Sequence, residues 1–197
     1  MFPKSAAWYD AIYAWKDYKR EAERLHAHIQ RHARRPAAAL LDVACGTGQH
    51  LSHLKAQYTA EGLDLDQEML AIARKRLPDV VLHHADMFGF DLGRQFDVVV
   101  CLFSAIAYAR SFPKLVQALG HMSRHVRPGG LVIVEPFIRP DQFIPDHVAA
   151  LFVDQPGFSH EEYLAAFGGV GLGVAYDEEG LMGRGLYIGI RGGGPAE

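Results

Sequence analysis

The chain has little of what marks a secreted, membrane-bound or nucleic-acid-binding protein. Its 197 residues include only two cysteines, too few for a disulfide framework, and a net charge of −3 provides no basic excess for nucleic-acid phosphates. No apolar run reaches the roughly 20 residues of a membrane span, and the first residues lack the basic-then-apolar order of a signal peptide. We therefore expect a cytoplasmic protein without membrane or nucleic-acid partners. The eleven histidines lack partners at metal-ligand spacing, so we expect no metal.

The most informative segment is LLDVACGTGQH, residues 40–50. An apolar run of strand length enters a turn that contains Gly46 and Gly48, and a helical pattern follows. Glycine allows peptide N–H groups and the start of the next helix to approach polar ligand atoms. A second strand-like segment, 59–65, brings Asp64 sixteen residues after Gly48. This spacing suits a carboxylate that accepts hydrogen bonds from ribose hydroxyls.

Two common nucleotide-binding patterns do not fit this segment. A dinucleotide fingerprint requires a small residue three positions after the second glycine, where this chain has Leu51. No Gly-Lys-Ser/Thr follows the turn, so a P-loop is excluded. The remaining pattern, DVACGTG, resembles the first motif of class I methyltransferases, which use S-adenosylmethionine and release S-adenosylhomocysteine. The resemblance implies that Gly46 and Gly48 flank the methionine and ribose portion of this donor.

The rest of the chain alternates helical and strand patterns in the order expected of that fold. Buried strands are predicted at 96–103 and 131–135, helices at 69–77, 112–126 and 159–167, and closing strands at 172–177 and 185–191. Between the helix ending at 126 and the strand from 131, Pro128 and two glycines predict a turn. We expect a single α/β domain, a Rossmann-like seven-stranded sheet that is mostly parallel, with a C-terminal antiparallel hairpin and helices on both faces. Its expected parts are an N-terminal covering helix (1–35), a donor-binding core (36–135), a shortened acceptor loop (136–158) and a closing helix with hairpin (159–197).

A narrower resemblance follows from motifs spread along the chain: YDAIY, WKDYKREA, LPDVVLHHADM, FSAIAY, RPGGLVIVEPF and GRGLYIGIRG. These look like the N,N-dimethyltransferases that act on nucleotide-linked aminosugars in deoxysugar biosynthesis. The resemblance implies a small-molecule amine acceptor that is methylated twice. Together with the glycine pattern, it places the donor against Tyr13, Lys16, Ala44, Gly46, Gly48, Asp64, Leu65, Asp86, Met87 and Leu102.

The catalytic residues expected from the resemblance are Tyr13, beside the methyl donor and the amine, and Tyr108, at the acceptor pocket. The reaction is an in-line attack by a neutral amine, so a group must favour the neutral form or accept its proton. Glu135, at the end of a buried strand, is a candidate for that task, and capping of a backbone group is an equally good reading. His147 is a second candidate, with a solvated loop position as the alternative.

The N-terminal segment carries an apolar stripe at helical spacing, which predicts one amphipathic helix: Trp8, Ile12, Trp15, Ala22, Leu25 and Ile29. Aromatic residues concentrate at its start, more than a packing stripe needs: Trp8, Tyr9, Tyr13 and Trp15. Aromatic faces stabilise a sulfonium by cation–π attraction. We therefore expect this end of the helix to cover the donor.

The chain departs from the aminosugar family in one region. The family has an antiparallel excursion after the strand that corresponds to 131–135, which covers the sugar nucleotide and contributes to dimer contacts. Here only the proline-rich segment 136–157 is present. Monomer and homodimer therefore both remain open, as do O-methylation and a noncatalytic S-adenosylmethionine-binding or interaction module. The loop FSAIAY lacks the Asn-Pro-Pro-Tyr pattern of exocyclic-amine methyltransferases, which argues against DNA as the acceptor.

Overall fold

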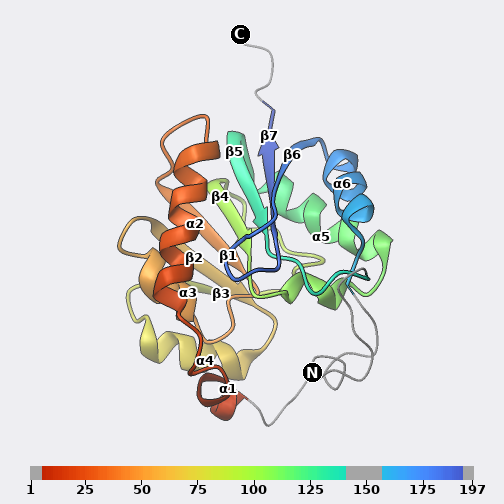
Figure 1. Cartoon of the computed structure of the whole chain (residues 1–197). Coiled ribbons are helices and arrows are strands. Elements are labelled where there is room, and N and C mark those ends of the chain that lie inside the picture. Colours follow the sequence, from red (N-terminus) through yellow and green to blue (C-terminus); the bar gives the residue numbers. More distant parts are fainter. Residues whose placement is uncertain (1–5, 141–156, 193–197) are drawn as a thin grey trace.

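A computed structural model of the chain describes residues 6–140 and 157–192. A twisted sheet crosses the molecule and helices cover both of its faces (Figure 1). The strands are β1 (Ala39–Val43), β2 (Thr59–Asp64), β3 (Val81–His84), β4 (Phe96–Cys101), β5 (Val126–Val134), β6 (Leu172–Asp177) and β7 (Leu186–Arg191). The helices are α1 (Ala6–Ile12), α2 (Tyr18–His32), α3 (Gln49–Leu54), α4 (Gln67–Arg76), the 3₁₀ helix η1 (Ala105–Ala109), α5 (Phe112–Arg124) and α6 (His160–Gly169).

The sheet has the strand order β3-β2-β1-β4-β5-β7-β6. Neighbouring strands from β3 to β5 are parallel, whereas β7 is antiparallel to both β5 and β6. This confirms the predicted seven-stranded fold and its closing hairpin. The strand order reverses between β1 and β4, and ligands of open α/β sheets bind beyond the carboxyl ends of the strands at such a point.

The two central strands are buried along their whole length, as expected for apolar runs in a parallel sheet. One apolar core lies under α2 and α3, and the other lies under α5 and α6. The first core includes Leu25, Ile29, Leu51 and Leu54, and the second includes Leu115, Leu119, Met122 and Phe167. The sheet therefore forms a rigid platform whose carboxyl edge is free to carry a site.

The single N-terminal helix predicted from the apolar stripe is wrong in its first half. Helix α1 ends at Ile12, and α2 begins only after Asp17, whose side chain accepts a hydrogen bond from the N–H of Arg20 at 3.0 Å and caps it. Trp8 and Trp15 are 68% and 69% exposed and belong to no core. The true packing stripe lies in α2 alone, because the cap at Asp17 restarts the helix with a new orientation.

The turn predicted around Pro128 is also placed differently. Helix α5 already ends at Arg124, and Pro128 lies inside β5, in an irregular stretch where the pairing with β4 shifts register. A Cβ atom on Gly130 would lie 2.4 Å from the carbonyl oxygen of Asp97, so only glycine fits there. The Asp97 carboxylate accepts hydrogen bonds at 2.9 Å from the N–H of Ala39 and from Arg127. This carboxylate holds the irregular part of β5 against the start of β1.

The described ends of the acceptor segment lie side by side, since the N–H of Gly157 donates to the carbonyl of Ile138 at 2.8 Å. Residues 141–156, with His147 among them, lie outside the described residues. In the described part of the chain, no helix is long and apolar enough to cross a membrane.

Candidate active site

The glycine loop follows β1 at the switch point of the sheet. Ala44 has a φ of 60°, a left-handed value that non-glycine residues seldom adopt, and the loop turns sharply there. Gly48 has a φ of 77°, and a Cβ atom on it would lie 2.7 Å from Leu77 in the segment after α4. Both its conformation and its close approach therefore require glycine. Gly46 has open space where a Cβ would stand, so this part of the loop faces outward.

Asp64 lies beside this loop at the end of β2. One carboxylate oxygen accepts a hydrogen bond from the N–H of Gly46 at 2.8 Å, and the other accepts from the N–H of Asp66 at 2.8 Å. Burial raises the pKa of Asp64, and these backbone donors oppose the rise. Each oxygen keeps a second lone pair. The predicted role as a ribose acceptor is therefore compatible with the structure, and Asp64 also shapes the loop.

Four further residues predicted to bind the donor follow β2, β3 and β4. Leu65 is 47% exposed at the end of β2. Asp86 is exposed, and one of its oxygens accepts from the N–H of Phe88 at 2.9 Å, which leaves the other available. Met87 and Leu102 are buried at 8% and 3% exposure and pack in the cores. Contacts of these four residues with the donor remain predictions.

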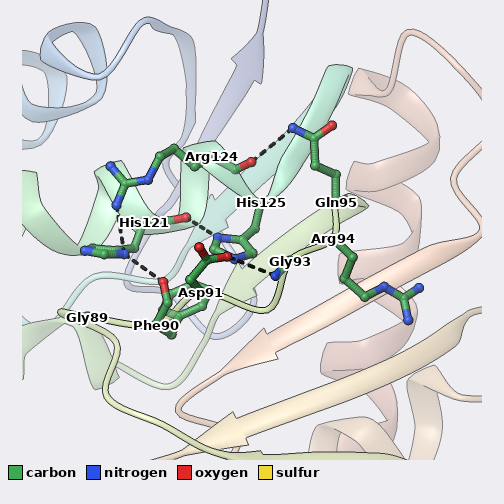
Figure 2. A pocket seen from close by; sticks show the side chains of 9 residues that line it. All are labelled: Gly89, Phe90, Asp91, Gly93, Arg94, Gln95, His121, Arg124 and His125. Carbon is green, nitrogen blue, oxygen red and sulfur yellow. Dashed lines mark hydrogen bonds and ion pairs between the residues drawn. The ribbon is translucent and has the colours of Figure 1, made fainter.

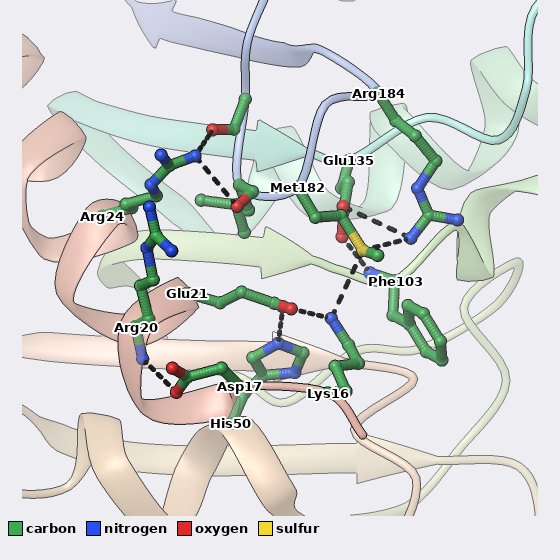
Figure 3. Close-up of polar contacts among 12 residues, drawn as sticks. Lys16, Asp17, Arg20, Glu21, Arg24, His50, Phe103, Glu135, Met182 and Arg184 are labelled. Atoms are coloured by element: carbon green, nitrogen blue, oxygen red, sulfur yellow. Dashed lines mark hydrogen bonds and ion pairs between the residues drawn. The ribbon is translucent and has the colours of Figure 1, made fainter. Parts of the chain in front are cut away.

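A strained turn follows β4. Phe103 and Ser104 have φ values of 50° and 62°, a conformation that persists only when its surroundings fix it. Glu135, which is fully buried, accepts from the N–H of Phe103 at 2.6 Å and lies 3.4 Å from Arg184 (Figure 3). The Ser104 hydroxyl donates to the carbonyl of Pro136 at 2.9 Å. The backbone-capping role of Glu135 is thus present in the structure, and its role as a proton acceptor stays a prediction.

A buried charged cluster lies next to this turn. The Lys16 ammonium pairs with Glu21, whose second oxygen lies 2.8 Å from Nε2 of His50 (Figure 3). The ammonium also lies 4.4 Å from the centre of the Phe103 ring. Burial lowers the pKa of Lys16, whereas the hydrogen bond and charge of Glu21 oppose that shift. The Lys16 side chain is fully buried, so its predicted contact with the donor's carboxylate would compete with Glu21.

Aromatic side chains gather next to the turn after β4 and near Asp64. The Tyr13 ring lies 4.8 Å from the rings of both Tyr9 and Phe103, and Tyr108 is 63% exposed in η1. Burial raises the pKa of Tyr9, and the neighbouring phenols and Asp64 raise it further, so this phenol keeps its proton at neutral pH. The structure therefore brings Tyr9 and Tyr13, two of the aromatic residues noted at the start of the N-terminal segment, into one cluster with Phe103.

Three residues of the site escaped sequence reasoning. Asp42 in β1 is 2% exposed, and burial, followed by the charge of Asp64, raises its pKa to about 8. An acid inside the apolar run LLDV was a visible signal for this residue. The sequence around Glu21 and Arg184 contains no such signal. Their place in the site comes from contacts with His50 and Glu135, which are distant in sequence.

A separate hollow of about 320 Å³ is lined by the residues labelled in Figure 2. It is lined by residues that precede β4 and β5, so it opens at the amino ends of these strands. Its charged groups already have partners: Arg94 pairs with Glu61, and Arg124 lies 2.9 Å from His121. We do not assign the donor to this hollow, because the carboxyl edge holds both the glycine loop and Asp64.

Comparison of this chain with known proteins shows which family it belongs to. A family profile described as a methyltransferase domain matches residues 40–130. The dTDP-3-amino-3,6-dideoxy-alpha-D-glucopyranose N,N-dimethyltransferase of Streptomyces fradiae is 40% identical, over 93% of this chain and 89% of the relative. The chain belongs to the family of nucleotide-aminosugar N,N-dimethyltransferases. It is accordingly an S-adenosylmethionine-dependent methyltransferase, as its motifs indicated.

Other members of the family extend the likeness. The dTDP-4-amino-2,3,4,6-tetradeoxy-D-glucose N,N-dimethyltransferase of Saccharopolyspora spinosa is 33% identical, over 96% of this chain and 93% of the relative. The S-adenosylmethionine-bound structure of CalS10, an amino pentose methyltransferase from Micromonospora echinaspora, has a TM-score of 0.84 at 33% identity and covers 93% of this chain and 96% of that one. The alignment with the Streptomyces fradiae enzyme spans 229 positions, more than the 197 residues of this chain. That family member therefore has residues without a counterpart here, in agreement with the trimmed acceptor segment.

Proposed function

We propose that this methyltransferase transfers methyl groups to the amino group of a nucleotide-linked aminosugar. The observation that carries the proposal is the contact between Asp64 and the N–H of Gly46, at the carboxyl edge of the sheet and beside the aromatic cluster. The full-length likeness to aminosugar N,N-dimethyltransferases supports an amine as the acceptor. The sugars named for these relatives carry the amine at different carbons, C3 in one and C4 in the other. The likeness therefore supports the substrate class rather than one position on the sugar ring.

We assign the donor to the glycine loop, with Asp64 holding its ribose and Asp86, Leu65 and Met87 around its adenine. When bound, S-adenosylmethionine supplies an electrophilic methyl group on a sulfonium. The Tyr13 ring, whose centre lies 4.8 Å from that of Phe103, provides a face suited to a cation. The open side of Gly46 and the free lone pairs of Asp64 give the donor's polar groups room and partners. Tyr13 and Lys16 complete the proposed donor set at its methionine end.

We assign the acceptor to the side of Tyr13 and Tyr108. Tyr13 would orient the attacking nitrogen, and Tyr108 would border the sugar from the rim. Both oxygens of Glu135 already have partners, Phe103 and Arg184. We therefore propose that Glu135 favours the cationic product through its buried charge and fixes the turn, rather than removing a proton by direct contact. No covalent intermediate is needed, because alignment of nucleophile and methyl group is the main contribution.

In this proposal residues 36–135 bind the donor and residues 136–158 bind the acceptor. Residues 1–35 cover the donor, and residues 159–197 complete the domain with a helix and a hairpin. We further propose that the enzyme works in the cytoplasm, without nucleic acid, as a monomer or homodimer. The net charge of −3 supports the absence of a nucleic-acid acceptor.

The test is an acceptor panel with S-adenosylmethionine, followed by mass spectrometry of the products. We expect methylation of dTDP-3-amino-3,6-dideoxyglucose or its 4-amino isomer, and none of the matched dTDP-sugars that carry a hydroxyl in place of the amine. Methylation of the hydroxyl compounds alone would establish an O-methyltransferase. Donor binding without turnover of any panel member would favour a noncatalytic module.

A further inference from the structure

Helix α1 has few apolar contacts to hold it beside the glycine loop. Trp8 is 68% exposed and Ile12 is 56% exposed, although both are large and apolar. The helix has only seven residues, and such a short helix does not persist in water by itself. Its Tyr9 ring nevertheless contacts the ring of Tyr13, which in turn contacts Phe103. Some other interaction must fix the helix where these rings meet.

Asp10 provides that interaction. One carboxylate oxygen accepts a hydrogen bond from the hydroxyl of Thr47 at 2.7 Å, and the other pairs with the guanidinium of Arg76. Arg76 also donates to the carbonyl of Thr47. These three residues close a ring of polar contacts between α1, the glycine loop and the last residue of α4. We call this set the Asp10 latch.

The latch is ionic under ordinary conditions. Burial raises the pKa of Asp10, but hydrogen bonds from Thr47, Arg76 and Gln49 and the charge of Arg76 outweigh burial, so the net pKa is lowered. The side chains of Asp10 and Arg76 are 31% and 25% exposed, so water screens the pair only in part. Thr47 itself is 1% exposed, and its backbone lies between the two glycines of the donor loop.

We propose that the Asp10 latch positions Tyr9 and Tyr13 beside the glycine loop and the turn at Phe103, so that Asp10 and Arg76 are positioning residues for methyl transfer. Asp10 directly follows Tyr9 and stands three residues before Tyr13, which allows its anchor on the glycine loop to set the height and orientation of both rings. Asp10 and Arg76 touch the loop rather than the reacting atoms. The inference rests on the proposed function, because it assigns those rings to the site of transfer.

The kinetic test compares Asp10→Asn, Arg76→Gln and the double variant. We expect each single change to lower kcat about tenfold, the size typical of a lost charged hydrogen bond. The dissociation constant for S-adenosylhomocysteine should change less than threefold, because Asp64 and the loop N–H groups stay in place. The double variant should also lose about tenfold, since both residues act through one contact. A hundredfold loss in the double variant, or unchanged kcat in the singles, would overturn the proposal.

A second measurement is independent of turnover. The chain has two tryptophans, and Trp15→Phe leaves Trp8 of α1 as the only one. In that background Asp10→Asn should lower the fluorescence anisotropy of Trp8, because α1 loses its anchor. Unchanged anisotropy would refute the latch. If the parent protein methylates no acceptor while the anisotropy falls as expected, the proposed function fails and the anchoring of α1 stands.

The chain offers a matched control. Lys55 pairs with Asp79 at 2.9 Å, and this pair connects the end of α3 with the segment after α4 without touching α1. Asp79→Asn removes an ion pair of the same kind and should leave both kcat and Trp8 anisotropy unchanged. Equal losses in Asp79→Asn and Asp10→Asn would show that general destabilisation, rather than the latch, controls turnover.

Discussion

Replacement of Asp64 tests how the donor is held. In the structure its two oxygens accept hydrogen bonds from the N–H groups of Gly46 and Asp66, and their second lone pairs are the proposed acceptors for two ribose hydroxyls. Hydrogen bonds to a charged group contribute roughly 1.5 to 3 kcal/mol each, but water replaces part of this when the partner is removed. We expect Asp64→Ala to weaken binding of S-adenosylhomocysteine by about 1 to 3 kcal/mol, or about 5- to 150-fold.

Isothermal titration calorimetry provides the measurement, and Asp66→Ala provides its control. Asp66 caps α4 by accepting from the N–H groups of Glu68 at 2.8 Å and Met69 at 3.3 Å. Its loss should cost about 1 kcal/mol of folding stability and leave donor affinity nearly unchanged. Unchanged affinity in a folded Asp64→Ala protein would refute the ribose assignment. Equal losses of affinity in the two variants would show that loop geometry alone is responsible.

Three further outcomes are expected. Tyr13→Phe should slow methyl transfer with nearly normal donor affinity, and equal turnover by both proteins would remove the phenol from the mechanism. Gly48→Ala should destabilise the fold by at least about 1 kcal/mol in urea denaturation, because its φ of 77° and the 2.7 Å approach to Leu77 exclude a methyl group; an unchanged midpoint would contradict this. Burial raises the pKa of Asp42 from 3.8 to about 8, so between these values the folded protein holds a proton that the unfolded chain has released, and this group lowers stability as pH rises. Asp42→Asn should remove a slope of about 1.4 kcal/mol per pH unit between roughly pH 5 and 7, and equal slopes for the two proteins would refute the shift.

The sheet could be predicted from sequence because each central strand is a nearly continuous apolar run. The segment 98–100 lies in a short apolar run rich in β-branched residues, and this length and composition indicate a strand buried on both faces. The same reasoning failed for the N-terminal helix. There Trp8 and Trp15 continue the apolar period of α2, yet the local cap at Asp17 and the polar latch at Asp10 decide where the chain bends.

The donor loop could likewise be predicted, because the two glycines and Asp64 lie within one short segment of the sequence at a typical spacing. The surrounding groups could not. Glu135 and Arg184 are 49 residues apart in sequence, and Glu21 and His50 are 29 apart. Each pair therefore comes into contact only when the chain has folded. Residue type alone gives no hint that Glu135 supports the strained turn at Phe103.

The most direct test of the central claim follows the methyl group itself. The enzyme is mixed with S-adenosylmethionine deuterated in its methyl group and with dTDP-3-amino-3,6-dideoxyglucose or its 4-amino isomer, and the products are examined by mass spectrometry and NMR. The account predicts deuterated methyl on the sugar nitrogen, with one S-adenosylhomocysteine formed for each methyl transferred. Label on a hydroxyl, or a donor that binds and stays intact with both acceptors, would contradict it.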